Sequence, residues 1–143
     1  MFFSNRYKQV VFSFFRSVIL LLAFLVLPGF SSFSIKPPDQ EWVGHIAKGE
    51  SKKLSSYLSQ VVSLELLSQS GSYNKNQAVM VLADFFSLYP AEKVVLRQTG
   101  TTGSTNMYFI GDYECRNVVY RLYVQMNNLS GEYLIYSMSI KKK

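Results

Sequence analysis

The second half of the chain consists of apolar and tyrosine-rich segments separated by short turns. Turns are predicted where Gly, Thr, Asn and Ser gather, at residues 99–105, 116–117 and 127–132. The segments between them predict four strands, at residues 93–98, 106–114, 118–126 and 133–141. Consecutive strands joined by short turns pair antiparallel, so this half of the chain is expected to fold as a β-meander.

Alternating apolar side chains predict which face of two of these strands is buried. In the third strand the predicted inward set is Val118, Tyr120, Leu122, Val124 and Met126. In the fourth strand it is Leu134, Tyr136, Met138 and Ile140. Because successive side chains of a strand point to opposite faces, the residues between them are expected on the other side of the sheet.

One long helix is predicted ahead of the meander, from Asn74 to about Leu88. Asn74 and Gln77 have the spacing of a capping box, and Pro90 prevents the helix from continuing. The apolar residues cover about half of the helix surface, which suits a helix lying in the concave face of a curved sheet.

The segment before the long helix predicts two short helices and one more strand. The helices are expected at residues 41–48 and 50–58, separated by Gly49, and the strand at residues 61–67, followed by a turn at residues 68–73. The predicted fold class is therefore α+β. A curved antiparallel sheet, made of a meander of about four strands plus the earlier strand, would wrap around the long helix.

The beginning of the chain has the three parts of a secretory signal peptide. Arg6, Lys8 and Arg16 form a basic region, residues 18–27 are an unbroken apolar run, and small serines follow. A membrane span needs about 20 predominantly apolar residues, more than this run provides. An uncleaved N-terminal anchor, which would make the protein a membrane-tethered accessory domain, is the alternative.

The cleavage site defines the predicted domain organisation. Cleavage is predicted after Ser34, with Ser31 as a second candidate, because small residues at these positions suit the cut. The expected organisation is a signal peptide at residues 1–34 and a single domain at residues 35–143. This domain would be exported and would work in the periplasm or outside the cell.

Charge and cysteine content limit which partners the protein can bind and whether it can form a disulfide. The chain has 15 Lys and Arg against nine Asp and Glu, and loss of the signal peptide would lower the basic count to 12. Much of the remaining excess is the lysine run at residues 141–143, interpreted as a solvated end. Nucleic-acid surfaces carry longer basic runs, so no nucleic-acid partner is expected. Cys115 is the only cysteine, so an intramolecular disulfide cannot form.

Several short stretches between residues 41 and 141 resemble a known family. The stretches are Gly49-Glu50-x-x-x-Leu54, Phe85-Phe86-x-x-x-Pro90, Tyr108-Phe109-Ile110-Gly111 and Tyr120-Arg121-Leu122-Tyr123. They resemble a small exported family of unknown function from Bacteroidetes, within the nuclear transport factor 2-like superfamily of cystatin-like α+β domains. The family tends to have a His-x-Gly-like segment where this chain has Arg97-Gln98-Thr99-Gly100, so that histidine is missing. The resemblance implies a cone-shaped domain and no particular reaction.

Acid–base chemistry has few candidate residues in this chain. Enzymes of the superfamily that are similar to ketosteroid isomerase need an acid or base inside the cone. Asp112 and Glu114 share strand parity with Tyr108 and are considered for that role, with a small pocket enzyme as the alternative function. His45, the only histidine, is interpreted as exposed beside Glu41 on the polar side of the first helix. One histidine and one cysteine cannot form a usual zinc site, so no catalytic residue, metal or cofactor is predicted.

Tyrosines concentrated on the meander provide the candidate binding surface. Arg121 lies mid-strand between Val119 and Tyr123, on the face opposite the apolar set. It is interpreted either as an anion-binding cation or as a side chain paired with a cross-strand acid. The predicted residues for binding a ligand or partner are Tyr120, Arg121, Tyr123, Arg97 and Tyr108.

The function predicted from these observations is that of an exported, non-enzymatic binding or assembly domain. It would use the tyrosine-rich sheet face or the mouth of the cone, because tyrosine offers apolar area with a polar tip. The expected occupant is a small ligand, a protein partner or a second copy of the chain.

Overall fold

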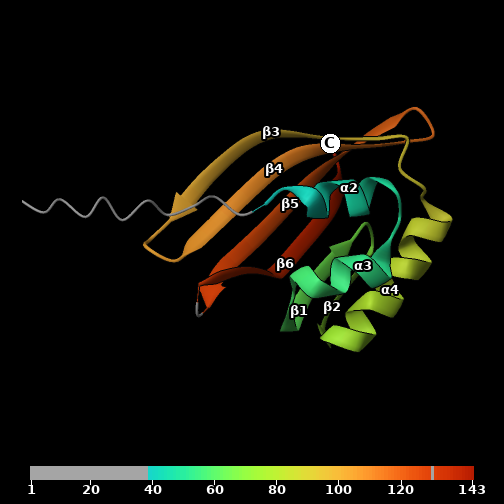
Figure 1. The fold of residues 1–143 in the computed structure, drawn as a ribbon. Coiled ribbons are helices and arrows are strands. Elements are labelled where there is room, and N and C mark those ends of the chain that lie inside the picture. The colour runs from blue at the N-terminus through green and yellow to red at the C-terminus, as the bar shows by residue number, and fades with distance from the viewer. Residues whose placement is uncertain (1–38, 130) are drawn as a thin grey trace, which may run out of the picture. The chain divides into compact units, whose positions relative to one another are not determined.

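A six-stranded sheet forms the centre of the structure shown in Figure 1, a computed structural model that describes residues 39–129 and 131–143. The strands are β1 (Leu58–Leu66), β2 (Gln69–Asn74), β3 (Lys93–Thr102), β4 (Asn106–Cys115), β5 (Val118–Leu129) and β6 (Glu132–Lys142). Their order across the sheet is β2-β1-β6-β5-β4-β3. Neighbouring strands are antiparallel except β1 and β6, which are parallel. The predicted signal peptide and cleavage site lie outside the described residues.

The helices lie along one face of this sheet (Figure 1). They are α2 (Glu41–Ala47), α3 (Ser51–Leu54), the 3₁₀ turn η1 (Ser55–Tyr57) and α4 (Lys75–Leu88). Within the described residues, no helix has the length and apolar character needed to cross a membrane. The predicted α+β class, with a sheet curved around helices, is confirmed.

Local sequence signals define the end of α2 and the start of α4 as predicted. The helix predicted at residues 50–58 is shorter than expected, since Leu58 already begins β1, which was predicted to start at residue 61. The side chain of Asn74 accepts a hydrogen bond from the Gln77 amide at 2.9 Å, and the Gln77 side chain accepts one from the Asn74 amide at 3.2 Å. This capping box starts α4. Gly49 has a φ of +68° and reverses the chain after α2, a conformation that glycine adopts without strain.

The segment predicted as a turn at residues 68–73 is instead mostly strand. Gln69–Asn74 forms β2, which pairs antiparallel with β1 in a hairpin whose turn has Leu67 at a φ of +57°. Nearly all of its residues are polar, so alternation gave no strand signal. Backbone hydrogen bonds to β1 stabilise it as an edge strand, and they depend on pairing rather than on the side chains of β2.

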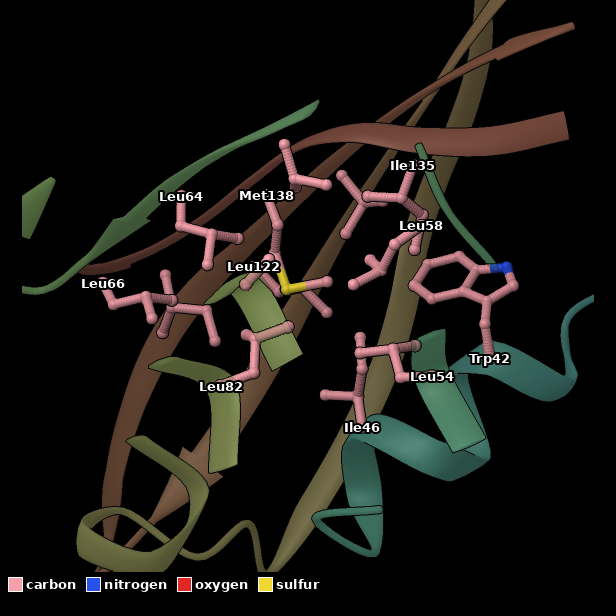
Figure 2. Packing of buried hydrophobic residues seen from close by; sticks show 14 of the residues in the cluster. Trp42, Ile46, Leu54, Leu58, Leu64, Leu66, Leu82, Leu122, Ile135 and Met138 are labelled. Atoms are coloured by element: carbon pink, nitrogen blue, oxygen red, sulfur yellow. The ribbon is translucent and has the colours of Figure 1, made fainter. Parts of the chain in front are cut away.

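The core fills the space between the helices and the inner face of the sheet (Figure 2). Fully buried side chains converge from every layer, including Trp42 and Ile46 of α2, Leu54 of α3, Leu82 of α4 and Phe109 of β4. The Trp42 and Phe109 rings meet edge to face with their centroids 5.2 Å apart. Burial of these large apolar side chains is the main stabilising contribution to the fold.

The buried surface of α4 is narrower than its sequence predicts. Ala78, Leu82, Phe85 and Phe86 are buried, whereas Leu88 is 63% exposed. The helix lies beside β1 and β2 at one side of the sheet (Figure 1), so only one part of its surface faces the core. The prediction that the sheet wraps around this helix alone was therefore too simple, because α2 and α3 cover part of the same face.

Alternation in β5 is confirmed, but that in β6 is broken by a bulge. On β5, Leu122, Val124 and Met126 are buried as predicted, whereas Val118 at the start of the strand is 37% exposed. Gln125 and Met126 of β5 pair with Ser137 and Ile135 of β6. Tyr136 is therefore an extra residue of β6 without a partner on β5. The buried β6 residues are therefore Ile135, Met138 and Ile140; the prediction that Leu134 and Tyr136 share the buried face was wrong.

Candidate functional site

The face of the sheet that points away from the helices carries the candidate site, and we call it the outer face. Its central residues are Tyr108, Ile110 and Asp112 of β4, Arg121 and Tyr123 of β5, and Lys141 of β6. They alternate with core residues along each strand. In the register of the sheet, Arg121 lies between Asp112 and Lys141, and Tyr123 lies opposite Ile110. Directly opposed residues share a face, so these side chains form one contiguous surface.

Two tyrosines form the aromatic part of the outer face. The rings of Tyr108 and Tyr123 have centroids 6.2 Å apart and an interplanar angle of 39°. Gln98 donates a hydrogen bond from Nε2 to the Tyr108 hydroxyl at 3.3 Å. Gly100 lies opposite Tyr108, and a Cβ at this glycine would come within 2.4 Å of the Tyr108 ring. The glycine thus gives the ring room to lie flat along the sheet.

Asp112 is the centre of the charged part of the outer face. Its Oδ1 lies 2.7 Å from Lys143 Nζ and its Oδ2 lies 2.9 Å from Arg97 Nε, and its side chain is only 10% exposed. Hydrogen bonds from Lys143 and then Arg97 hold the pKa of Asp112 below its usual value, although burial opposes them. A carboxylate held in this way stays ionised at neutral pH and acts as an ion-pair partner.

A bulge in β3 positions Arg97 for this contact. Leu96 pairs with Gly111 and Gln98 pairs with Ile110, which leaves Arg97 as the extra residue. A bulge redirects the side chain of the extra residue, and here the guanidinium reaches Asp112 on the neighbouring strand.

The lysine run at residues 141–143, predicted to be a solvated end, is exposed, but two of its side chains also form ion pairs. Lys141 Nζ lies 2.8 Å from Glu65 Oε1 on β1, and Lys143 contacts Asp112 on β4. Both lysines therefore lie across the outer face and pair with acids on other strands. Each keeps about half of its side chain exposed, with 54% for Lys141 and 43% for Lys143.

Of the five predicted binding residues, four lie together and one does not. Arg97, Tyr108, Arg121 and Tyr123 belong to the outer face, whereas Tyr120 pairs with Tyr113 in register and packs against the core. Tyr120 therefore does not lie beside Arg121 and Tyr123 on one surface, as the predicted site requires. Strand alternation alone separates Tyr120 from the other two.

Unlike its register neighbours Asp112 and Lys141, Arg121 has no charged partner among the described residues. It lies directly opposite Asp112, but both oxygens of that carboxylate are taken by Arg97 and Lys143. Among residues 39–129 and 131–143, no hydrogen bond or ion pair involves the Arg121 side chain. The interpretation of Arg121 as paired with a cross-strand acid is thus not what the structure shows.

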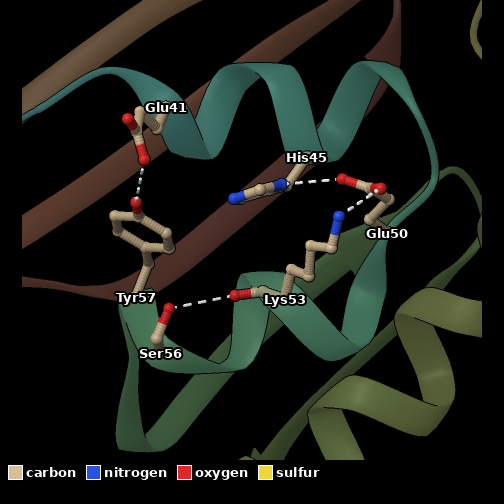
Figure 3. Close-up of polar contacts among 6 residues, drawn as sticks. All are labelled: Glu41, His45, Glu50, Lys53, Ser56 and Tyr57. Carbon is tan, nitrogen blue, oxygen red and sulfur yellow. Dashed lines mark hydrogen bonds and ion pairs between the residues drawn. The ribbon is translucent and has the colours of Figure 1, made fainter.

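A second polar cluster joins α2 to α3 and η1 (Figure 3). His45 Nδ1 lies 2.8 Å from Glu50 Oε2, and Lys53 Nζ lies 2.7 Å from Glu50 Oε1. Tyr57 donates a long hydrogen bond of 3.5 Å to Glu41. Lys53 and then His45 lower the pKa of Glu50 to about 2. His45 was expected to be exposed, but it is partly buried and held by Glu50, so the cluster connects helices rather than facing a cavity.

The residues considered for chemistry are divided between the two faces of the sheet. Asp112 lies on the outer face, and Glu114 shares that face because it is two residues along β4. Cys115 is buried on the opposite side of the sheet. In the part of the chain that the structure describes, no group of three or more His, Cys, Asp or Glu side chains is arranged to hold a metal ion.

Several polar residues of the two clusters were missed by sequence reasoning. Glu50 and Lys53 are three residues apart, a spacing that favours ion pairs on a helix and could have identified them. Glu65 and Lys143 had no such signal. Their pairing with residues of distant strands depends on the order and register of the sheet, which no local pattern contains.

Solved structures show that this architecture has an NTF2-like fold. The chain is similar to a putative dehydratase from the NTF2-like family of Streptomyces avermitilis, with 10% identity, coverage of 71% of this chain and 89% of the other, and a TM-score of 0.55. At this identity the likeness shows the fold alone. The predicted nuclear transport factor 2-like fold is confirmed.

The family is shown by a match over most of the domain. Residues 40–141 match the family described as a domain of unknown function, DUF4783, and the chain belongs to that family. It is similar to a family member from Bacteroides ovatus at 21% identity, covering 73% of this chain and 94% of the other with a TM-score of 0.68. For a member from Bacteroides fragilis the values are 27%, 71%, 94% and 0.65. No curated protein matches the chain. The predicted resemblance to a Bacteroidetes family of unknown function is confirmed.

Proposed function

We propose that this protein is an exported, non-enzymatic binding or assembly domain whose working surface is the outer face. The observation that carries the proposal is that the Tyr108 and Tyr123 rings, with centroids 6.2 Å apart, lie beside Arg121. Arg121 is two residues from Tyr123 on β5, and its guanidinium has no ion pair with a described residue. Interfaces are enriched in tyrosine and arginine, because these side chains combine apolar area with hydrogen bonding.

The packing of the domain interior favours the outer face, rather than the mouth of the cone, as the binding surface. Trp42, Phe109, Met126 and Ile135 are fully buried between the helices and the sheet. These side chains fill the part of the concave side that lies between the helices and the sheet. The outer face, in contrast, offers its tyrosines half-buried and its Arg121 exposed.

The non-enzymatic part of the proposal is supported by the state of Asp112. A general acid or base works best when its pKa lies near the operating pH. The pKa of Asp112 is shifted in the opposite direction by Lys143 and Arg97. A carboxylate with this environment anchors its neighbours and is poorly suited to transfer protons at neutral pH.

Self-association is tested first, by light scattering on the purified protein and on the double variant Tyr123→Ala with Arg121→Ala. The control is Met80→Ala with Lys52→Ala, which also removes one apolar and one cationic side chain, both exposed on the helices. A dimer lost only in the outer-face variant supports assembly through this face. A monomer in all three proteins contradicts self-association and leaves binding of a different partner as the function.

Export is tested separately, by cell fractionation and by mass spectrometry of the N-terminus. The proposal expects a soluble periplasmic or secreted chain that begins at Ile35 or Ser32. A Leu21→Arg variant should block export, because a charge in the apolar run opposes insertion. A membrane-bound chain with an intact N-terminus would contradict cleavage and support the membrane-tethered alternative.

A further inference from the structure

The guanidinium of Arg121 lies in a part of the outer face that carries more cations than acids. Asp112 is paired with Arg97 and Lys143, and Glu65 is paired with Lys141. Lys93 and Glu114 lie opposite each other on the same face. With them, this part of the sheet carries five cations (Lys93, Arg97, Arg121, Lys141 and Lys143) against three acids (Glu65, Asp112 and Glu114). The two neighbours of Arg121 in register are Asp112 and Lys141. The surplus positive charge therefore gathers around Arg121.

An aromatic surface adjoins this charge. Tyr123 is two residues from Arg121 on β5 and faces the same side, and the Tyr108 ring lies against it. A guanidinium recognises a carboxylate through two parallel hydrogen bonds, and tyrosine rings bury apolar or aromatic groups at small entropic cost. The combination fits a chain segment that carries a carboxylate next to an apolar or aromatic side chain.

The distribution of charges favours such a segment over two other occupants. In a two-fold contact centred on Arg121, a second copy would place the same surplus of cations opposite itself, which costs energy. A nucleic acid presents a continuous row of phosphates, which would meet the carboxylates of Asp112 and Glu65 as well as the cations. A polypeptide with spaced carboxylates avoids both conflicts.

We infer that the outer face binds an acidic protein segment, with a carboxylate on Arg121 and a neighbouring apolar or aromatic side chain on Tyr123. This inference rests on the proposed function, since it names the partner class of the same surface. Lys141 and Lys143 contribute to attraction at longer range, because each retains an exposed ammonium group.

The test uses two synthetic probes, a short peptide of alternating Glu and Tyr and its match in which Gln replaces Glu. Amide chemical shifts of the purified protein are followed while each peptide is added. The Glu peptide should shift the amides of Arg121 and Tyr123, and the Gln peptide should bind about tenfold more weakly because it lacks charge-assisted hydrogen bonds. Added salt should weaken only the Glu peptide.

Variants at one position separate charge from geometry. Arg121→Gln should weaken the Glu peptide about tenfold, and Arg121→Lys should lie between, since lysine retains the charge without the planar fork. Lys52→Gln, which removes an exposed cation on α3, is the matched control and should leave binding unchanged. Exposed Arg121 has no partner to lose among the described residues, so its variants are expected to fold.

The outcomes distinguish this inference from the proposed function. Equal binding of the two peptides at the outer face, or no effect of Arg121→Gln, would overturn the inference of an acidic partner. The outer face would still be the binding surface. A dimer that forms through the outer face and excludes both peptides would also overturn the inference of an acidic partner. The occupant of the outer face would then be a second copy of the chain. If neither peptide nor self-association involves the outer face, both proposals are wrong.

Discussion

The hydroxyl of Tyr113 donates a hydrogen bond to the main-chain carbonyl oxygen of Tyr89 and thereby joins β4 to the end of α4. Tyr113 is fully buried, and this burial, with a smaller contribution from Cys115, raises the pKa of its hydroxyl well above the usual value. Arg116 adds a second link, since its guanidinium donates to the Leu88 carbonyl at 3.0 Å. The C-terminal end of α4 is therefore anchored to the sheet by side chains of the β4–β5 hairpin.

Replacement of Tyr113 by Phe should lower the free energy of unfolding by about 1 to 2 kcal/mol, because the Tyr89 carbonyl loses its donor while the ring stays packed. Urea unfolding measures the change. Tyr136→Phe is the control, since its hydroxyl makes no hydrogen bond with a described residue. Equal losses in the two variants would show that the Tyr113 hydrogen bond contributes little.

The ion pairs of Asp112 should make stability depend on pH in the acid range. The folded chain holds the pKa of Asp112 below its unfolded value, so the unfolded chain binds the proton first as the pH falls. The stabilising contribution is complete above about pH 4, the unfolded value, and is lost as the pH falls through the lower folded value.

Asp112→Asn should therefore be less stable than the original chain at neutral pH, and the difference should shrink below about pH 4. Thermal unfolding at a series of pH values measures both. Asp84→Asn removes an exposed carboxylate of α4 and controls for the change in net charge. A stability difference that is the same at every pH would contradict the role assigned to the Asp112 carboxylate.

Glu50 should stabilise the contact between α2 and α3 in a similar pH-dependent way. Lys53 and His45 lower its pKa from 4.5 to about 2, so its contribution is present above pH 4.5 and lost as the pH falls toward 2. Glu50→Gln is expected to unfold at a lower temperature than the original chain at pH 7 and at a similar temperature near pH 2. Glu132→Gln, at an exposed carboxylate without an ion pair to a described residue, should show no such convergence.

Two glycines of the sheet should respond differently to the same substitution. At Gly111 a Cβ would lie 2.6 Å from the main-chain oxygen of Val95, so Gly111→Ala must displace a strand and should destabilise by about 1 to 3 kcal/mol. At Gly100 the Cβ would meet only the far end of the Tyr108 side chain, which can rotate away.

Gly100→Ala should accordingly have a smaller effect on unfolding but should move the Tyr108 ring away from Tyr123. Urea unfolding measures the first effect, and aromatic chemical shifts of the two tyrosines measure the second. If Gly100→Ala were the more destabilising of the two, the Tyr108 ring would be held more rigidly than its surface position indicates.

Elements stabilised by local interactions could be predicted from spacing along the chain. The capping box of Asn74 and Gln77 starts α4 because its hydrogen bonds join residues three apart, and alternation in β5 predicted that Leu122 and Val124 are buried. Such signals depend on spacing within one element, so they can be read before the chain is folded.

Features that depend on pairing between strands could not be predicted in this way, because they form only in the folded sheet. The bulge at Tyr136 changes which residues of the first part of β6 are buried, because the register with β5 shifts there. β2 is a strand because β1 supplies its backbone hydrogen bonds. The candidate site has the same origin. Arg121 has no ion pair with a described residue because Asp112, directly opposite it, is paired with Arg97 and Lys143. The register of the sheet brings Arg97 and Lys143 together from opposite ends of the meander.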